Sequence, residues 1–159
     1  MIATIKRSDA LEHDNMLSFS GISLFANLLP KDMAKFTDAA QIKRYKKGEF
    51  LYSAGERAEF FYIICSGWLK LFRITNEGKE IILAMLTRNS VTGENAIFEE
   101  GRFTSSVQVV EDAQIWVIPF SLLKEQLQAN NQLALNMLAS LVQYQRRHEM
   151  QQEQYLVPR

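Results

Sequence analysis

One stretch of the chain, residues 93–111 with the sequence GENAIFEEGRFTSSVQVVE, gathers side chains that could bind a phosphorylated ligand. Glu94 offers a carboxylate, and Thr104 and Ser105 offer hydroxyls. A buried phosphate monoanion also needs a cation, and a guanidinium supplies one through two parallel hydrogen bonds. Burying the anion without such a partner would cost several kcal/mol or more. Arg102 is the only basic residue of this stretch, so phosphate binding depends on where it points.

Residues suited to metal or nucleophilic chemistry are few. The single cysteine, Cys65, excludes an intramolecular disulfide, a CxxC zinc site and a four-cysteine iron-sulfur cluster. The two histidines, His13 and His148, flank the β-rich part of the chain, whereas metal-binding cupins collect several histidines and a glutamate from barrel strands. No Gly-x-Ser-x-Gly elbow, phosphate loop or His-Glu-x-x-His motif occurs. We therefore do not expect an enzyme.

The composition predicts one soluble domain. A chain of 159 residues with 47% apolar residues is long enough for a single well-buried core with appended helices. Its 18 basic and 18 acidic residues give no general attraction to nucleic acid, so this segment is not expected to bind DNA by itself. No apolar run approaches the roughly 18 residues of a membrane helix. The first residues lack the apolar core of a signal peptide. We expect a cytoplasmic protein with no membrane partner.

The elements that must hold residues 93–111 in place are short strands. From residue 41, runs rich in Ile, Val, Phe and Tyr alternate with turn glycines about every ten residues, which is typical of a small antiparallel barrel or jelly roll. The pattern predicts a mainly β fold, an antiparallel β-roll over residues 41–118. N-terminal helices in residues 1–40 precede it, and a short helix and a long helix over residues 119–156 follow it.

The last four residues, LVPR, match the upstream half of a thrombin cleavage site. We interpret residues 157–159, together with Leu156, as a tag-cleavage remnant and exclude them from the fold. A designed stop at this point predicts that the natural protein is longer.

The long helix carries a seam whose residues recur at spacings of 4, 3, 4, 3 and 4. Such spacing is typical of a coiled coil. A helix packed on its own roll is the alternative, but the half beyond Tyr144 is too long for so small a roll to cover. We therefore predict a homodimer with the two helices side by side. The seam consists of Met137, Leu141, Tyr144, His148, Gln151 and Tyr155.

Residues 55–101 resemble the sensory domain of the Crp/Fnr superfamily of bacterial regulators, and the resemblance extends from about residue 22 to 156. It rests on a series of turns: Gly-Glu at 55, Ser-Gly at 66, Glu-Gly-Lys-Glu at 77, Gly-Glu at 93 and Glu-Glu-Gly at 99. The resemblance implies an eight-stranded β-roll, a dimerisation helix and a helix-turn-helix DNA-binding domain beyond this sequence. It also implies an effector, bound between roll and long helix, that changes how the dimer helices pack.

In family members that bind cyclic AMP, a Gly-Glu pair contacts the ribose, which carries over to Gly93 and Glu94. An Arg-Ser pair about ten residues later holds the cyclic phosphate. Counting without a gap places Thr104 and Ser105 at these positions, whereas a one-residue deletion in the loop places Phe103 at that of the arginine. None of these residues is cationic, so the resemblance predicts an effector other than cyclic AMP.

Three further residues bear on the effector pocket. Arg102 lies one or two places early, and a one-residue slip on a strand turns a side chain to the opposite face, so we expect a solvated loop charge. The alternative is a cyclic-nucleotide domain with a rearranged phosphate site that uses Arg102. Strand positions that line the family pocket carry over to Leu83 and Leu86, which suit a flat apolar ligand.

The lack of the phosphate-binding arginine resembles the nitric-oxide-responsive branch of the superfamily. An aromatic residue at that position resembles the dissimilative nitrate respiration regulators. This resemblance implies haem, whose iron needs an axial ligand such as His, Cys, Met or Tyr. The candidates are His148, which the resemblance places where the long helix passes the pocket, and His13. The alternative for His148 is a seam histidine between the helices, and the alternative for His13 is an exposed helix residue. Cys65, Met85 and Met137 are expected to pack ordinarily. An iron-sulfur cluster is not expected, because no N-terminal cysteines occur.

Overall fold

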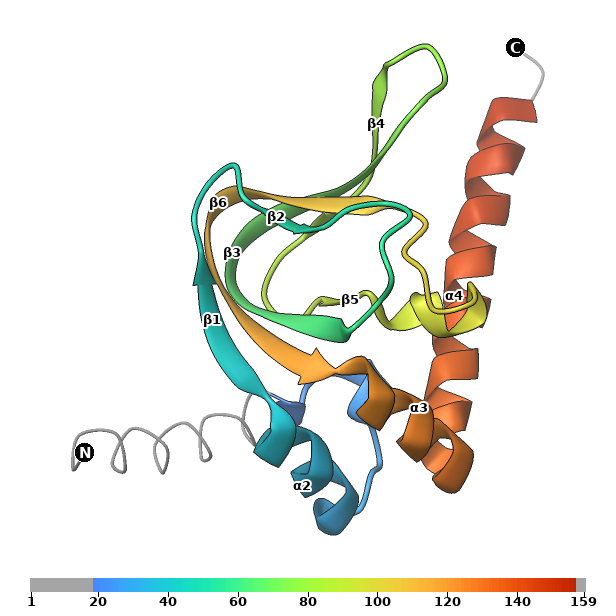
Figure 1. Cartoon of the computed structure of the whole chain (residues 1–159). Helices are drawn as coiled ribbons and strands as arrows, with labels where there is room; N and C mark the ends of the chain where they lie inside the picture. The colour runs from blue at the N-terminus through green and yellow to red at the C-terminus, as the bar shows by residue number, and fades with distance from the viewer. Residues whose placement is uncertain (1–18, 157–159) are drawn as a thin grey trace.

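The computed structural model describes the backbone of residues 19–156 and the side chains of residues 19–147. One antiparallel sheet curls into a roll, with helices below it and along one side (Figure 1). The predicted fold class, an antiparallel β-roll with flanking helices, is confirmed. The strand order is β1-β6-β3-β4, with β2 paired to β6 and β5 paired to β3. The strands are β1 Gln41–Tyr45, β2 Phe50–Tyr52, β3 Phe60–Ile74, β4 Glu80–Leu86, β5 Val91–Thr92 and β6 Ser106–Pro119.

The described part has six strands and not the eight that the resemblance implies, because β3 and β6 are long enough to serve both ends of the roll. β3 has 15 residues and β6 has 14. Their pairing shifts register around Ser66 and Trp68, where the strands bend. Gly67 between them has φ +95°, and a Cβ there would lie 2.5 Å from the carbonyl oxygen of Asp112. A side chain at this bend would therefore push the two strands apart.

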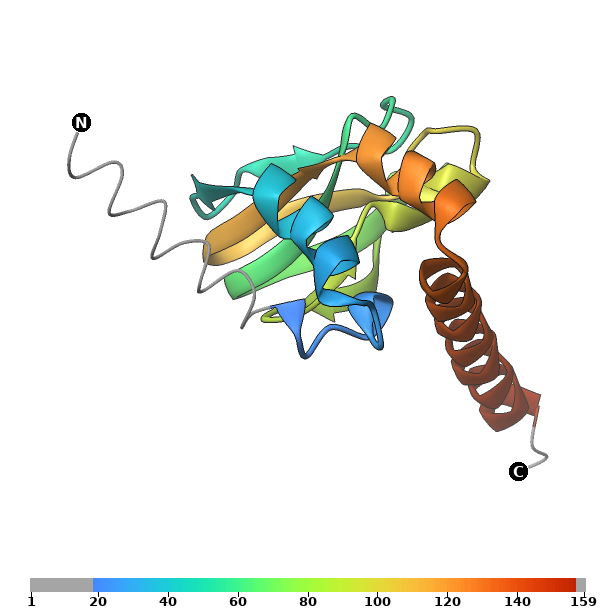
Figure 2. The same cartoon turned by 90° about the horizontal axis from the view of Figure 1, so that it is seen from below.

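The N-terminal elements close one end of the roll through aromatic contacts. The short 3-10 helix η1 spans Ser23–Phe25 and α2 spans Pro30–Ala39. The ring of Phe19 lies 6.2 Å from that of Trp116 on β6, and the ring of Phe36 lies 6.3 Å from that of Phe61 on β3. Seen from below, these elements and α3 (Phe120–Ala129) lie across the roll, and α4 (Asn131–Leu156) leaves to one side (Figure 2).

The first turns of α4 are fixed to the same domain. The Nδ2 atom of Asn136 donates hydrogen bonds to the carbonyl oxygens of Leu24 (2.9 Å) and Ala26 (2.8 Å). Leu133 is fully buried and Met137 is 3% exposed. The predicted dimer seam is therefore wrong at Met137, because packing against its own domain already covers this side chain.

The two remaining seam residues whose side chains are described do not form a buried row. Leu141 is half-buried and Tyr144 is exposed, while the side chains of His148, Gln151 and Tyr155 lie outside the described part. The exposed apolar residues of α4 are instead Leu135 at 58%, Leu138 at 56% and Val142 at 47%. We refer to these three residues as the α4 stripe. None of the described helices is long and apolar enough to span a membrane.

Candidate functional site

Gly93 connects β5 to the short 3-10 helix η2 (Glu94–Phe98) and sets the backbone of the candidate site. Its φ is +88°, and a Cβ there would lie 3.2 Å from the Cε1 atom of Phe103 and 3.5 Å from the Cα of Phe61. Glycine is favoured at this position both because its φ is positive and because two other segments approach it closely. The turn places Glu94 at the first position of η2.

Glu94 is the buried acid of the site. The residue as a whole is half-buried, and its Oε2 atom is buried and has no hydrogen-bond partner among the described residues. Burial raises the pKa of Glu94 from 4.5 to about 7, and a hydrogen bond from its own backbone N–H partly opposes this shift. The carboxyl group is therefore a mixture of charged and neutral forms near neutral pH, and its Oε2 atom is an unpaired acceptor in the described part of the chain.

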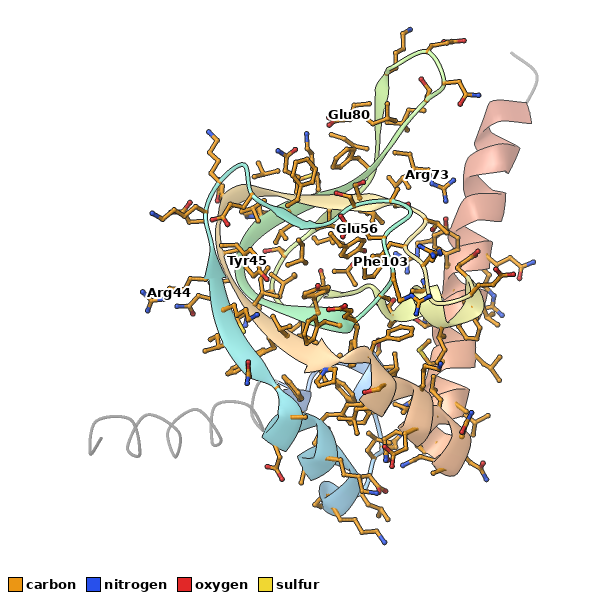
Figure 3. All side chains as sticks on the ribbon, in the orientation of Figure 1. Arg44, Tyr45, Glu56, Arg73, Glu80 and Phe103 are labelled. Atoms are coloured by element: carbon orange, nitrogen blue, oxygen red, sulfur yellow. The ribbon has the colours of Figure 1, made fainter. Side chains whose placement is uncertain are left out.

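Phe103 fills the interior beside this turn (Figure 3). It is 6% exposed, and its ring stacks on Tyr52 with centroids 3.8 Å apart and an interplanar angle of 19°. Tyr52 in turn stacks on Tyr62 at 5.8 Å, and its hydroxyl lies 2.7 Å from the Oγ1 atom of Thr92. Burial raises the pKa of both tyrosines, so both remain neutral phenols. Of the two positions to which the family's phosphate-binding arginine could correspond, Phe103 thus belongs to a neutral aromatic stack and Thr104 is exposed.

Arg102 points away from this interior. The residue is exposed, its Nη1 atom donates a hydrogen bond of 2.9 Å to the carbonyl oxygen of Gly55, and its backbone forms an isolated antiparallel bridge with Arg57. The expectation of a solvated loop charge is therefore confirmed. This contact holds the guanidinium at the surface of the loop, so a phosphate site inside the roll that uses Arg102 would require its side chain to reorient.

Sequence reasoning missed Arg73, which contacts the hydroxyl-rich segment after Phe103. The Nε atom of Arg73 donates a hydrogen bond of 3.2 Å to the Oγ atom of Ser105, which is 7% exposed, whereas Thr104 is exposed. A sequence signal existed, because Arg73 continues the alternation of the apolar residues Leu69 and Leu71. Figure 3 shows Arg73 near the base of β4.

The two leucines predicted to line the pocket lie in different environments. Leu86 pairs with Leu69 and is 9% exposed, so it belongs to the interior. Leu83 is 46% exposed, and the expectation that it lines the interior is wrong. Leu83 is the extra residue of a β-bulge, since Leu71 pairs with Ala84 and Phe72 pairs with Ile82. Its paired neighbours Ile81, Ile82 and Met85 are also exposed, so neither face of this part of β4 is covered by the described residues.

The candidate axial ligands of haem are only partly described. The side chain of His148 and all of His13 lie outside the described part. Cys65 is half-buried, and burial raises the pKa of its thiol to about 12, so a thiolate ligand is disfavoured. Met137 packs in the core as expected. Met85 is 46% exposed on β4, so the prediction that it packs in the interior is wrong. Among the described residues no three His, Cys, Asp or Glu side chains are grouped to hold a metal ion.

Comparison with known proteins matches residues 42–130 to the family described as cyclic nucleotide-binding domain. The anaerobic regulatory protein of Bacillus subtilis is 29% identical over 71% of this chain and 48% of its own length. A CRP-like cAMP-activated global transcriptional regulator of Mycobacterium tuberculosis is 30% identical over 64% of this chain and 44% of its own. The chain thus spans about half the length of these relatives.

Solved structures of bacterial regulators are similar to this chain in fold. The sensor domain of the transcriptional regulator DNR from Pseudomonas aeruginosa superposes with a TM-score of 0.75 and 25% identity, covering 93% of this chain and 96% of that one. The catabolite activator protein of Thermus thermophilus superposes with a TM-score of 0.72 and 24% identity, covering 84% of this chain and 62% of the other.

Proposed function

Because the chain belongs to the cyclic nucleotide-binding domain family, and within it to the Crp/Fnr regulators, we propose that it is the effector-sensing domain of a bacterial transcription factor. In this proposal it acts in the cytoplasm, is not an enzyme, and binds DNA only through a further domain that follows α4. The observation that carries the proposal is the Gly93–Glu94 turn, whose buried Oε2 atom is left without a partner in the described part. A buried acceptor of this kind is costly unless a ligand or a proton satisfies it.

The effector we propose is not cyclic AMP. Phe103 occupies the space beside Gly93, and its stack with Tyr52 contains no cation for a cyclic phosphate. Arg102, the cation nearest in sequence, is bonded to the carbonyl oxygen of Gly55. A cyclic nucleotide in the family's position would therefore meet a ring, and neither the aromatic stack nor Arg102 would pair its charge.

The response of this domain passes through α4 in a homodimer. Contacts around Leu133, Asn136 and Met137 hold the start of the helix to the domain, while the α4 stripe on its other side is exposed. The stripe residues are spaced by three and four, so they share one face of the helix. A second copy of α4 is the cover we propose for this face, and an effector that favours one packing of the two helices would reposition the DNA-binding domains.

Leu138→Glu tests the homodimer. Two copies of the variant would each lose a buried leucine and bring a carboxylate into the shared apolar seam, so the dimer dissociation constant should rise by at least about 100-fold. Sedimentation equilibrium of the purified domain measures this constant. Ser140→Glu is the matched control, since Ser140 is exposed roughly opposite the stripe and its substitution should leave the constant unchanged. If both variants associate as tightly as the wild type, the stripe is not the interface.

Sensing through haem is a second candidate function, supported by the exposed apolar surface of β4. Ile81, Leu83 and Met85 are each between 46% and 49% exposed, and Met85 adds a thioether that can bind iron. The described residues inside the roll fit haem less well, because their phenols and thiol stay protonated. His148 or His13 is the imidazole ligand we propose. Bound haem would supply an iron centre for a gas such as nitric oxide.

A titration with haemin followed by ultraviolet-visible absorption tests this candidate. We expect a sharp Soret band that saturates at equimolar haem and is lost in one of the two variants His148→Ala and His13→Ala. Met85→Leu keeps the size and apolarity of the side chain and reports whether the thioether is the second ligand. A broad absorbance that does not saturate, or identical spectra in all three variants, would exclude these ligands.

A further inference from the structure

We propose that Arg73 and Ser105 form an oxyanion-binding site at the base of β4, and that the effector carries a small phosphate or carboxylate group. This proposal rests on the effector-sensing function proposed above. It supplies the cation that residues 103–105 lack.

The register of the sheet places Arg73 on the inner face of the roll. On β3, Leu69 pairs with Val109 and Leu71 pairs with Val107, and the pairing is continuous from Leu69 onward. Leu69, Val107 and Val109 are each 2% exposed or less, so this face is the interior. Because side chains alternate along a strand, Arg73 lies on the same face as Leu69 and Leu71. Arg73 therefore follows the inward-facing Leu69 and Leu71 on β3 and places a cation at the end of this apolar row.

The neighbouring cation on β3 is different. Lys70 lies on the outer face, forms a salt bridge of 2.7 Å with Glu80 and sits 5.0 Å from the ring centroid of Phe72. Arg73 has no carboxylate within 4.0 Å in the described part of the chain, and its hydrogen bond to Ser105 uses the Nε atom alone. The inner-face cation therefore lacks the counterion that the outer-face cation has.

The free part of the Arg73 guanidinium is suited to an oxyanion. A guanidinium carries five N–H donors, so the Nη groups can bind two oxygens of one phosphate or carboxylate. The Ser105 hydroxyl accepts from Nε, which leaves its own hydrogen for a third anion oxygen. Arg73 is itself exposed, so a ligand can reach it without opening the core. Phe103 still fills the space beside Gly93, and the anionic group must therefore be small or lie outside that space.

Amide shifts in nitrogen-15 NMR spectra, recorded during titrations with inorganic phosphate and with acetate at constant ionic strength, test the site. For at least one of the two anions we expect saturable shifts centred on Arg73, Thr104 and Ser105. Arg73→Gln removes the charge and the fork and should weaken binding by about 10- to 100-fold. Arg102→Gln is the matched control, because it removes a guanidinium from the adjoining loop and should leave binding unchanged. The stronger anion identifies the effector group as a phosphate or a carboxylate.

Three results would overturn the proposal: shifts centred on Arg102, binding unaffected by Arg73→Gln, or no saturable shift with either anion. If Arg73→Gln does not fold, Ser105→Ala takes its place, and a several-fold weaker anion affinity is then the expected result. The dimer and haem measurements do not involve Arg73. A negative anion titration would therefore leave the effector-sensing function in place. Negative dimer and haem measurements would leave an anion site without its proposed role.

Discussion

Phe103→Ala should lower the free energy of unfolding by about 3–5 kcal/mol, the usual cost of removing a buried phenylalanine. The ring is 6% exposed, stacks on Tyr52 at 3.8 Å and covers the turn at Gly93, so its loss leaves a cavity lined by aromatic rings. Urea denaturation followed by tryptophan fluorescence and circular dichroism measures the change.

Phe98→Ala is the matched control for this variant. Phe98 belongs to the neighbouring η2 and is 54% exposed, so its substitution should cost less than about 1 kcal/mol. Equal losses in the two variants would mean that the ring of Phe103 is not part of a packed interior. The aromatic stack would then be no obstacle to a nucleotide beside Gly93.

Glu94→Gln should make the domain more stable above pH 7 and leave it about as stable as the wild type near pH 4.5. The unfolded carboxyl loses its proton near 4.5, whereas the folded pKa of Glu94 is about 7. Between these values the unfolded state binds fewer protons, so wild-type stability falls as pH rises through this window. The loss reaches at most about 3 kcal/mol above pH 7, since one pKa unit corresponds to about 1.4 kcal/mol. Glutamine has no charge to desolvate and should remove this pH dependence.

Urea midpoints measured from about pH 4 to about pH 8 for wild type and variant test the expectation. Glu99→Gln is the control, because Glu99 is exposed and directly follows η2. Its substitution should leave the pH dependence of stability as in the wild type. Parallel profiles of Glu94→Gln and wild type would show that the acid is solvated in the folded domain. An effector that donates a hydrogen bond to Glu94 would offset the same desolvation cost, so its affinity should depend on pH in this window.

The sequence alone determined the elements and their type. Strand alternation and turn glycines follow from backbone geometry that acts over a few residues, and they predicted the roll from residue 41 and the helices α2, α3 and α4. The lack of an arginine at Phe103 or Thr104 is likewise a property of the sequence, and it is the reason for proposing an effector other than cyclic AMP.

Only the tertiary structure decided which side chains lie inside. Arg73 and Ser105 meet because β3 and β6 pair across 32 residues of sequence. The exposure of Leu83 depends on whether another element covers β4. Met137 fits a helical seam by its spacing, yet packing against its own domain buries it. Periodicity identifies the faces of an element from local geometry, but which face is covered, and by what, depends on contacts between distant segments.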